Sequence, residues 1–207
     1  MENVKHMSVF TTMLLIMLFA APAGAGAQLS WQDNFDYPPG PLYGQGQWVK
    51  YASNPNSPIQ VVDKTLDFEG YPGGVKGRSV ELGPDATAED LIARFDPNDE
   101  GVKTGTLYYS ALVNVEEVPS GPIYVMSLVV RTKSSVVADG KSGTELGRLY
   151  VDKADEEGKY RLGVERGASD PSFAPQTFST GETCLVVVKY EIGAAGARLD
   201  GVSLVVN

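Results

Sequence analysis

The chain has 207 residues, of which 43% are hydrophobic and 21% charged, an ordinary composition for a globular protein. Its 26 Asp and Glu outnumber 17 Lys and Arg, and the resulting net charge of −9 disfavours nucleic acid as a partner. A single cysteine, Cys184, excludes an intramolecular disulfide and a thiolate metal cage.

The N-terminus has the layout of a secretory signal peptide. Lys5 precedes an apolar run from Met13 to Ala21, and small residues continue to Ala27. The run is shorter than the roughly 20 residues that a membrane-spanning helix needs. We therefore expect residues 1–27 to be removed, leaving 28–207 as one secreted domain without a transmembrane anchor. The only histidine, His6, lies in the leader, so histidine-dependent catalysis and histidine-ligated metals are excluded from the mature domain.

Short apolar runs, separated by Gly, Pro and Asn, dominate the remaining chain. In chain order the predicted strands are Ile59–Val62, Leu66–Phe68, Ser79–Leu82, Leu107–Val115, Ile123–Thr132, Leu146–Val151, Tyr160–Glu165, Leu185–Ile192 and Val202–Val206. Many short strands with frequent turn signals indicate an antiparallel sandwich or barrel. The one helical turn that the pattern supports is Ala86–Ile92. The predicted fold class is therefore all-β, an antiparallel β-sandwich with at most one short helix.

Six polar segments are predicted to be solvated loops: 37–46, 71–77, 96–105, 134–143, 152–158 and 168–176. Segment 152–158 contains Asp152, Asp155, Glu156 and Glu157 directly before Gly158. Acidic residues before a glycine are typical of a solvated hairpin turn. We interpret this cluster as turn charges and not as a catalytic group.

Several segments together resemble a known domain family. They are Asp33-Asn-Phe-Asp-Tyr-Pro-Pro-Gly-Pro-Leu, Gly46-Gln-Trp, Asn56-Ser-Pro-Ile-Gln-Val, Leu107-Tyr-Tyr-Ser-Ala-Leu-Val-Asn-Val, Gly147-Arg-Leu-Tyr-Val, Leu185-Val-Val-Val-Lys-Tyr-Glu and Asp200-Gly-Val-Ser-Leu-Val-Val-Asn. In this order they resemble the concanavalin A-like (laminin G-like) jelly-roll domain of secreted bacterial proteins. The resemblance implies a concanavalin A-like β-sandwich in an extracellular setting. Because family members are largely uncharacterised, it implies function only loosely.

The resemblance also bears on a structural metal and on where the domain ends. Jelly-roll glycan-binding domains commonly hold a structural Ca²⁺ between an N-terminal acid and an acid near the last strand, and Asp33 and Asp200 occupy the similar positions. The alternative is that both residues cap turns. The family often has an aromatic residue where this chain has Val205, and often continues further, so a longer protein beyond Asn207 is left open.

Aromatic side chains beside glycine- and proline-rich loops are candidates for a ligand platform. Sugar rings stack on Trp and Tyr, and Trp48, Tyr51 and Tyr71 lie beside such loops. The alternative for Trp48 is a place in the core. The expected partner is a neutral glycan or a cell-surface component, since the negative charge disfavours anionic glycans.

The carboxylates do not form a recognisable catalytic pair. Family-16-type glucanases share the jelly-roll fold and carry E-x-D-x-x-E on one strand, and that pattern is absent. Glu165 and Glu191 lie on predicted strands without an acid–base partner. We therefore expect a non-catalytic domain with a carbohydrate-binding, adhesive or structural role. The alternative is a glycan hydrolase or lyase that uses carboxylates or tyrosine.

Overall fold

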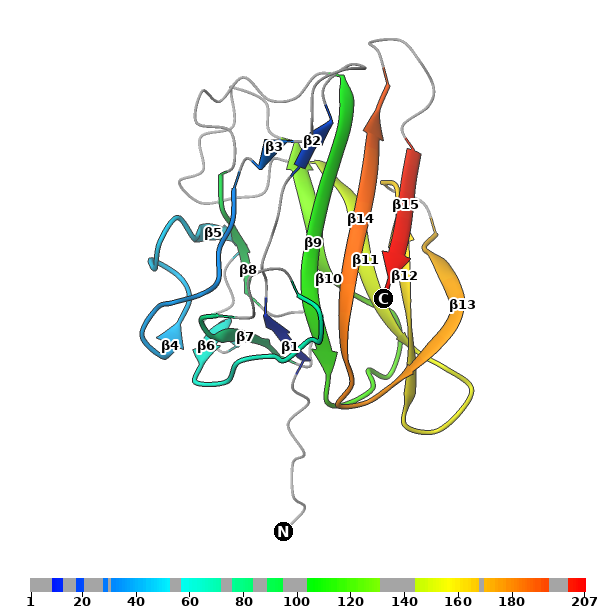
Figure 1. Ribbon diagram of the computed structural model, residues 1–207, viewed down its shortest axis with the longest axis horizontal. Helices are drawn as coiled ribbons and strands as arrows, with labels where there is room; N and C mark the ends of the chain where they lie inside the picture. The colour runs from blue at the N-terminus through cyan, green and yellow to red at the C-terminus, as the bar shows by residue number, and fades with distance from the viewer. Residues whose placement is uncertain are drawn as a thin grey trace.

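A computed structural model describes residues 9–12, 18–20, 28–29, 31–52, 57–71, 76–83, 89–94, 104–130, 144–167, 170–193 and 201–207. All regular elements in these segments are strands, and every described pairing is antiparallel. The strands form two main layers that face each other, with β9, β14 and β15 in front of β10, β11 and β12 in Figure 1. The chain is an all-β antiparallel sandwich, as the strand pattern predicts.

The larger sheet is built around the two longest apolar strands. β9 (Gly105–Val115) pairs along its length with β14 (Thr183–Ile192), and β15 (Gly201–Val206) continues the sheet beyond β14. On the other side of β9 the order is β1 (Val9–Thr12), β7 (Ser79–Leu82), β6 (Gln60–Val62) and β4 (Gly40–Pro41). The short strands β2 (Leu18–Ala20) and β3 (Gln28–Leu29) also join this sheet, since β2 pairs with β9.

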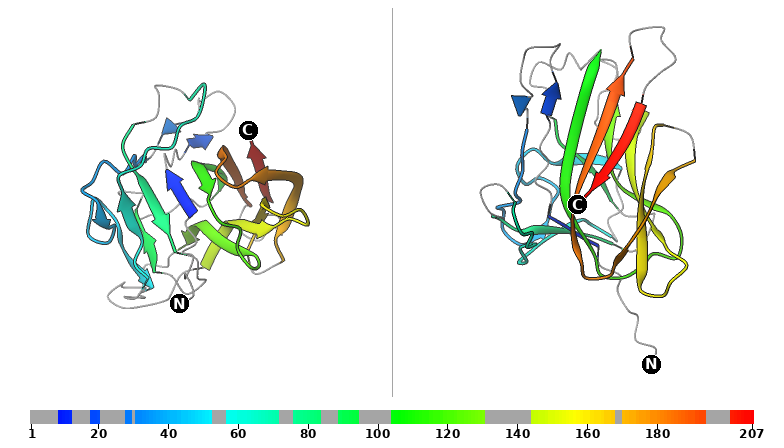
Figure 2. Two further views of the ribbon diagram at one scale, coloured as in Figure 1. Left: turned by 90° about the horizontal axis from the view of Figure 1, so that it is seen from below. Right: turned by 45° about the vertical axis from the view of Figure 1, so that its right-hand side comes forward.

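The second sheet is a meander of four strands in chain order. It consists of β10 (Ile123–Val130), β11 (Thr144–Lys153), β12 (Lys159–Glu165) and β13 (Ser172–Ser179). The right-hand view of Figure 2 shows β12 and β13 beside and behind β14 and β15. A separate ribbon joins β5 (Val49–Ala52) to β8 (Asp90–Ile92).

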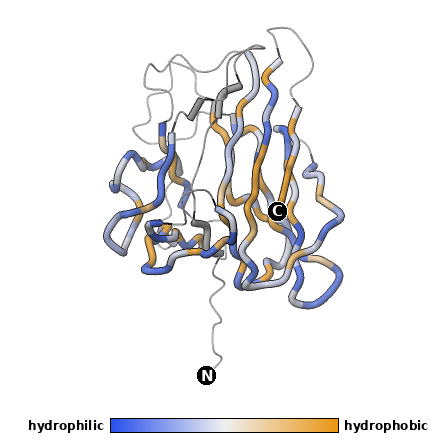
Figure 3. Tube along the Cα trace, in the orientation of Figure 1, coloured by the Kyte–Doolittle hydropathy of each residue, from blue (hydrophilic) through white to orange (hydrophobic). Residues whose placement is uncertain are grey.

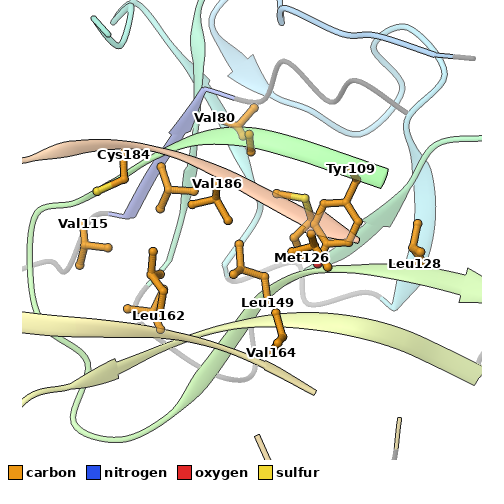
Figure 4. Close-up of a cluster of buried hydrophobic side chains, with 14 of the residues drawn as sticks. Val80, Tyr109, Val115, Met126, Leu128, Leu149, Leu162, Val164, Cys184 and Val186 are labelled. Carbon is orange, nitrogen blue, oxygen red and sulfur yellow. The ribbon is translucent and has the colours of Figure 1, made fainter. Parts of the chain in front are cut away.

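The core lies between the two main sheets. Alternate residues of β14 point into it, including Cys184, Val186 and Val188, and they are at most 2% exposed. From the facing sheet come Leu149 and Leu162, both fully buried, as the close-up in Figure 4 shows. Figure 3 shows apolar residues concentrated along the central strands and polar residues in the turns. Burial of alternate residues fixes the pairing register, because a slip of one residue would turn every core side chain to solvent.

Several local predictions are wrong. Leu66–Phe68, predicted as a strand, does not belong to any strand of the structure. Residues 90–92, expected to end a helical turn, form strand β8, because pairing with β5 and packing of Leu91 on the core outweigh a weak local helix signal. The predicted loop 168–176 overlaps strand β13, which contains Pro175. β13 is the last strand in its sheet order, and an edge strand tolerates proline because one side needs no ladder hydrogen bond.

Part of the predicted leader is paired within the larger sheet. β1 lies between β7 and β9, with Val9 opposite both Leu82 and Val115. This is the arrangement of the chain with residues 1–27 attached, and signal-peptide removal stays a prediction. No helix within the described segments is long and apolar enough to cross a membrane.

Candidate functional site

A row of aromatic residues crosses the outer face of the β10–β13 sheet. Tyr124 of β10 pairs with Tyr150 of β11, Tyr150 pairs with Gly163 of β12, and Gly163 pairs with Phe173 of β13. The rings of Tyr124 and Tyr150 meet edge to face, with their centroids 6.1 Å apart. Gly163 contributes no side chain, and a β-carbon there would lie 2.6 Å from Cδ1 of Phe173. The Phe173 ring therefore occupies the space that the glycine leaves. We call these four positions the aromatic row.

The aromatic row faces away from the core because strand residues alternate between the two sides of a sheet. In β11, Leu149 and Val151 are fully buried against the other sheet, which places Tyr150 on the outer side. Tyr124 is 37% exposed, the largest exposure of any aromatic ring in this sheet among the described residues. The row therefore gives this face a partly solvent-accessible apolar surface.

An arginine held by two carboxylates flanks the Tyr124 end of the row. Arg148 donates from Nη1 to Glu165 Oε2 at 3.0 Å and from Nε to Glu145 Oε2 at 2.8 Å. Its guanidinium carbon lies 5.2 Å from the ring centroid of Tyr124. The Tyr150 hydroxyl also donates to Glu165 Oε2, at 2.7 Å. These contacts fix the guanidinium over the ring in a preorganised position.

Burial and the neighbouring charges shift the titration of this cluster. Burial raises the pKa of Tyr124 to about 12, with further increases from Asp90 and Glu145 and an opposing effect of Arg148. For Arg148, burial lowers the pKa, but hydrogen bonds to Glu165 and Glu145 outweigh it and raise the pKa overall. Both groups therefore keep their neutral-pH protonation states, a neutral phenol beside a cation.

A second arginine flanks the Phe173 end of the row. Arg161 donates from Nη2 to Asp152 Oδ2 at 2.7 Å, and its guanidinium carbon lies 4.5 Å from the Phe173 centroid. Asp152 is only 5% exposed. It was expected among the solvated turn charges of 152–158, and that interpretation is wrong, because β11 continues to Lys153 and pairs Asp152 with Arg161.

Comparisons with protein-family models, curated proteins and solved structures give no match. The function is therefore inferred from the chemistry of the residues themselves. On the outer face of β10–β13 that chemistry is an aromatic row with an arginine–carboxylate pair at each end.

A second cluster surrounds Asp33, one of the two predicted calcium ligands. Asp33 is 7% exposed, and its oxygens accept from the Phe35 amide at 2.8 Å, the Tyr37 hydroxyl at 2.7 Å and Trp48 Nε1 at 2.8 Å. Phe35 is fully buried with a φ of 51°, a left-handed conformation that non-glycine residues adopt only where the surroundings fix it. Asp33 therefore holds this segment in shape as a hydrogen-bond acceptor.

The calcium prediction can be compared with the structure at one of its two residues. Asp200 lies outside the described residues. The Asp33 carboxylate already accepts three hydrogen bonds, so a cation would have to displace at least part of this set. The described residues contain no group of three or more potential metal-binding side chains. As arranged here, Asp33 is a poor fit to Ca²⁺, and the Asp33–Asp200 pair stays a prediction.

The three aromatic residues singled out from the sequence lie in different surroundings. Trp48 is 8% exposed, packs against Phe35 with a centroid distance of 5.7 Å and belongs to the core. Tyr51 and Tyr71 are partly exposed. The hydroxyl of Tyr71 is buried without a hydrogen-bond partner among the described residues, and burial raises its pKa to about 12. Ligand contact at these positions stays a prediction.

The two strand carboxylates noted in the sequence also differ. Glu165 is buried beneath the Arg148 side chain, whereas Glu191 is half-exposed and pairs with Lys189 at 2.9 Å. Tyr124, Tyr150 and Phe173 were not predicted as site residues. Tyr124 and Tyr150 lie in predicted apolar strands, whereas Phe173 lies among polar residues and proline, and only the pairing register brings the three rings onto one line.

Proposed function

We propose that this chain is a secreted, non-catalytic glycan-binding domain of the concanavalin A-like type, with its ligand on the outer face of the β10–β13 sheet. The observation that carries the proposal is the aromatic row with a guanidinium over the ring at each end. Pyranose rings present flat apolar faces to aromatic side chains, while charged groups beside the rings bond the hydroxyls. This face supplies both kinds of contact.

The charges on this face favour a neutral glycan. Asp152, Glu145 and Glu165 surround the row, and Asp90 is close enough to raise the pKa of Tyr124. Two guanidiniums, those of Arg148 and Arg161, lie beside these four carboxylates, so the local charge is negative. A uronic acid or sulfated sugar would meet net negative charge here, and the whole chain carries −9.

The carboxylates support binding more than catalysis. A glycosidase needs two carboxyl groups that reach the scissile bond from opposite sides. The Glu165 side chain is only 1% exposed, and the oxygen that Arg148 contacts also accepts from Tyr150. Glu165 therefore orients its neighbours without touching a surface ligand.

A second candidate function, glycan hydrolysis or elimination, has one observation in its favour. Tyr150 donates to Glu165 beside Arg148, and a tyrosine next to a carboxylate is a possible proton-transfer group. However, burial, followed by the Glu165 hydrogen bond, raises the pKa of Tyr150 despite the opposing effect of Arg148. A phenolate base is thus disfavoured at neutral pH, and the geometry favours binding.

Affinity gel electrophoresis tests the proposal. Xylan, galactomannan and starch represent neutral polysaccharides, and alginate and pectate represent anionic ones. We expect retardation by at least one neutral polymer and by neither anionic polymer. Tyr124→Ala and Phe173→Ala should abolish it, whereas Tyr43→Ala, which removes a 50% exposed ring outside the row, should not. Absence of retardation by every polymer refutes the proposal, and release of reducing sugar or unsaturated product, lost in Tyr150→Phe, establishes the catalytic alternative.

A further inference from the structure

The carboxylate of Asp152 is incompletely satisfied. Both hydrogen bonds from Arg161, from Nε at 3.2 Å and from Nη2 at 2.7 Å, end on the same oxygen, Oδ2. The other oxygen, Oδ1, is buried and has no hydrogen-bond partner among the described residues. A buried acceptor left without a donor is unfavourable. Because Oδ1 is covered, a surface ligand meets this ion pair through the exposed Arg161 side chain.

Arg161 supplies the complementary donors. A guanidinium has five N–H groups, and Asp152 takes bonds from two of its nitrogens. The Arg161 side chain is 42% exposed and lies over the Phe173 ring. An exposed donor, held in place by a buried carboxylate, thus lies next to an apolar ring.

We propose that Asp152, Arg161 and Phe173 form a second subsite that recognises two adjacent hydroxyls of a neutral sugar ring. The two hydroxyls accept from the N–H groups of Arg161 that Asp152 leaves free, Asp152 holds the guanidinium in place, and the ring face lies near Phe173. The inference rests on the proposed glycan-binding function and specifies its ligand.

The spacing of the two ends indicates a chain of sugars. Arg148 lies over Tyr124 on β10, and Arg161 lies over Phe173 on β13. Three strand spacings separate these strands, about 14 Å in all. This distance exceeds one pyranose ring, so a ligand that reaches both ends is an oligosaccharide or a polymer.

The need for adjacent hydroxyls also restricts the linkage. Inside a 1,4-linked pyranose chain the 2- and 3-hydroxyls remain free and adjacent. Inside a 1,3-linked chain the free 2- and 4-hydroxyls are separated by the linked position. The subsite therefore selects a neutral 1,4-linked chain over a 1,3-linked one.

Calorimetric titration of the domain tests the inference. The ligands are xylan, galactomannan and starch, followed by oligosaccharides of one to six units cut from whichever of these polymers binds most tightly. A 1,3-linked glucan and a periodate-oxidised sample of the same polymer, which lacks adjacent hydroxyls, are the ligand controls. For the unmodified domain we expect affinity to rise with chain length, with at least tenfold weaker binding of both control polymers.

Arg161→Met, which retains the aliphatic stem, and Asp152→Asn should remove the rise with chain length and leave binding of the shortest oligosaccharide unchanged. Lys153→Met, an exposed neighbour, is the matched control, and thermal unfolding checks that each variant is folded. The second subsite is refuted if both subsite variants bind the long chains with wild-type affinity. It is also refuted if the unmodified domain binds the 1,3-linked glucan as tightly as the 1,4-linked polymer. In either case the proposed glycan-binding function stands. If no polymer binds, both fall.

Discussion

Gly163 lies directly opposite Tyr150 in the pairing of β11 with β12, and the ring of Phe173 fills the space beside it. The glycine is thus required by a close approach of a ring and not by a turn. The continuity of the aromatic row across four strands depends on this one missing side chain.

Gly163→Ala should disrupt both stability and binding. The new β-carbon would lie 2.6 Å from Phe173 Cδ1 and 2.9 Å from the Ser172 carbonyl oxygen, so the ring must move. We expect a loss of about 1–3 kcal/mol in the free energy of unfolding, measured by urea denaturation, with weaker polysaccharide retardation. Gly121→Ala, where a β-carbon meets nothing within 4 Å, is the control. A Gly163→Ala protein as stable as wild type would contradict the close packing.

Asp33→Asn should destabilise the N-terminal segment. The amide that replaces one carboxylate oxygen would face the donors Tyr37 and Trp48, and a donor opposite a donor leaves buried groups unsatisfied. We expect a loss of about 1–3 kcal/mol by urea denaturation. Asp36→Asn, whose side chain is 76% exposed, should change stability by less than about 0.5 kcal/mol. Equal effects of the two substitutions would refute the structural role of Asp33.

The calcium prediction has a separate test. If Ca²⁺ binds Asp33 and Asp200, saturating Ca²⁺ should raise the melting temperature, by an amount equivalent to about 2.7 kcal/mol at one hundred times the dissociation constant. The rise should disappear with a chelator and in Asp200→Asn. A melting temperature that Ca²⁺ does not change would leave Asp33 as a hydrogen-bond acceptor alone.

Buried tyrosines predict loss of stability at alkaline pH. Burial raises the pKa of Tyr71 and Tyr124 to about 12, from 10.0 in an unfolded chain. The unfolded state then releases protons at lower pH than the folded state, so stability is intact below pH 10 and falls as the pH rises from 10 towards 12. Circular dichroism and phenolate absorbance should show this transition.

Tyr71→Phe isolates the contribution of Tyr71 to the loss of stability at alkaline pH. It removes a buried hydroxyl that has no partner among the described residues, so at pH 7 we expect no loss of stability. At pH 11 the variant should retain more stability than the wild type. A variant that is destabilised at pH 7 would show that the Tyr71 hydroxyl has a partner in solution.

Removal of the predicted leader should expose two strand edges. β1 pairs with β7 on one side and β9 on the other, so a protein of residues 28–207 lacks the partner of both. We expect faster amide hydrogen exchange at Val80 and Leu112 in this protein than in the full chain, with Val186 of β14 as the protected control. Equal protection in both proteins would show that another segment occupies this position.

The strands with clear apolar character were predictable from the sequence. β7 was predicted with its observed bounds, and β9 and β14 were predicted to within two residues. In β14 buried residues alternate with half-buried ones, whereas β9 is buried at every residue from Tyr109 to Val115, so its signal is a run of aromatic and aliphatic residues. β13 was missed because Pro175 and exposed polar residues mask it, and residues 90–92 were assigned to a helix because their strand character comes from packing.

The candidate site was less predictable, for a physical reason. Glu165 was noticed as a strand carboxylate, but its partners Arg148 and Tyr150 lie on a neighbouring strand at a register that the local sequence does not define. Gly163 carried no sequence signal of its own. The aromatic row depends on three pairing registers together, those of β10 with β11, β11 with β12 and β12 with β13.

The buried cysteine makes the domain convenient for site-specific labelling. Cys184 is the one cysteine of the chain and is 2% exposed, and burial raises its pKa, which disfavours the reactive thiolate. A second thiol introduced at the exposed position Thr177 of β13 would therefore react with a maleimide dye in preference to the native one. Such a Thr177→Cys conjugate places a fluorophore beside the aromatic row without prior removal of the natural cysteine.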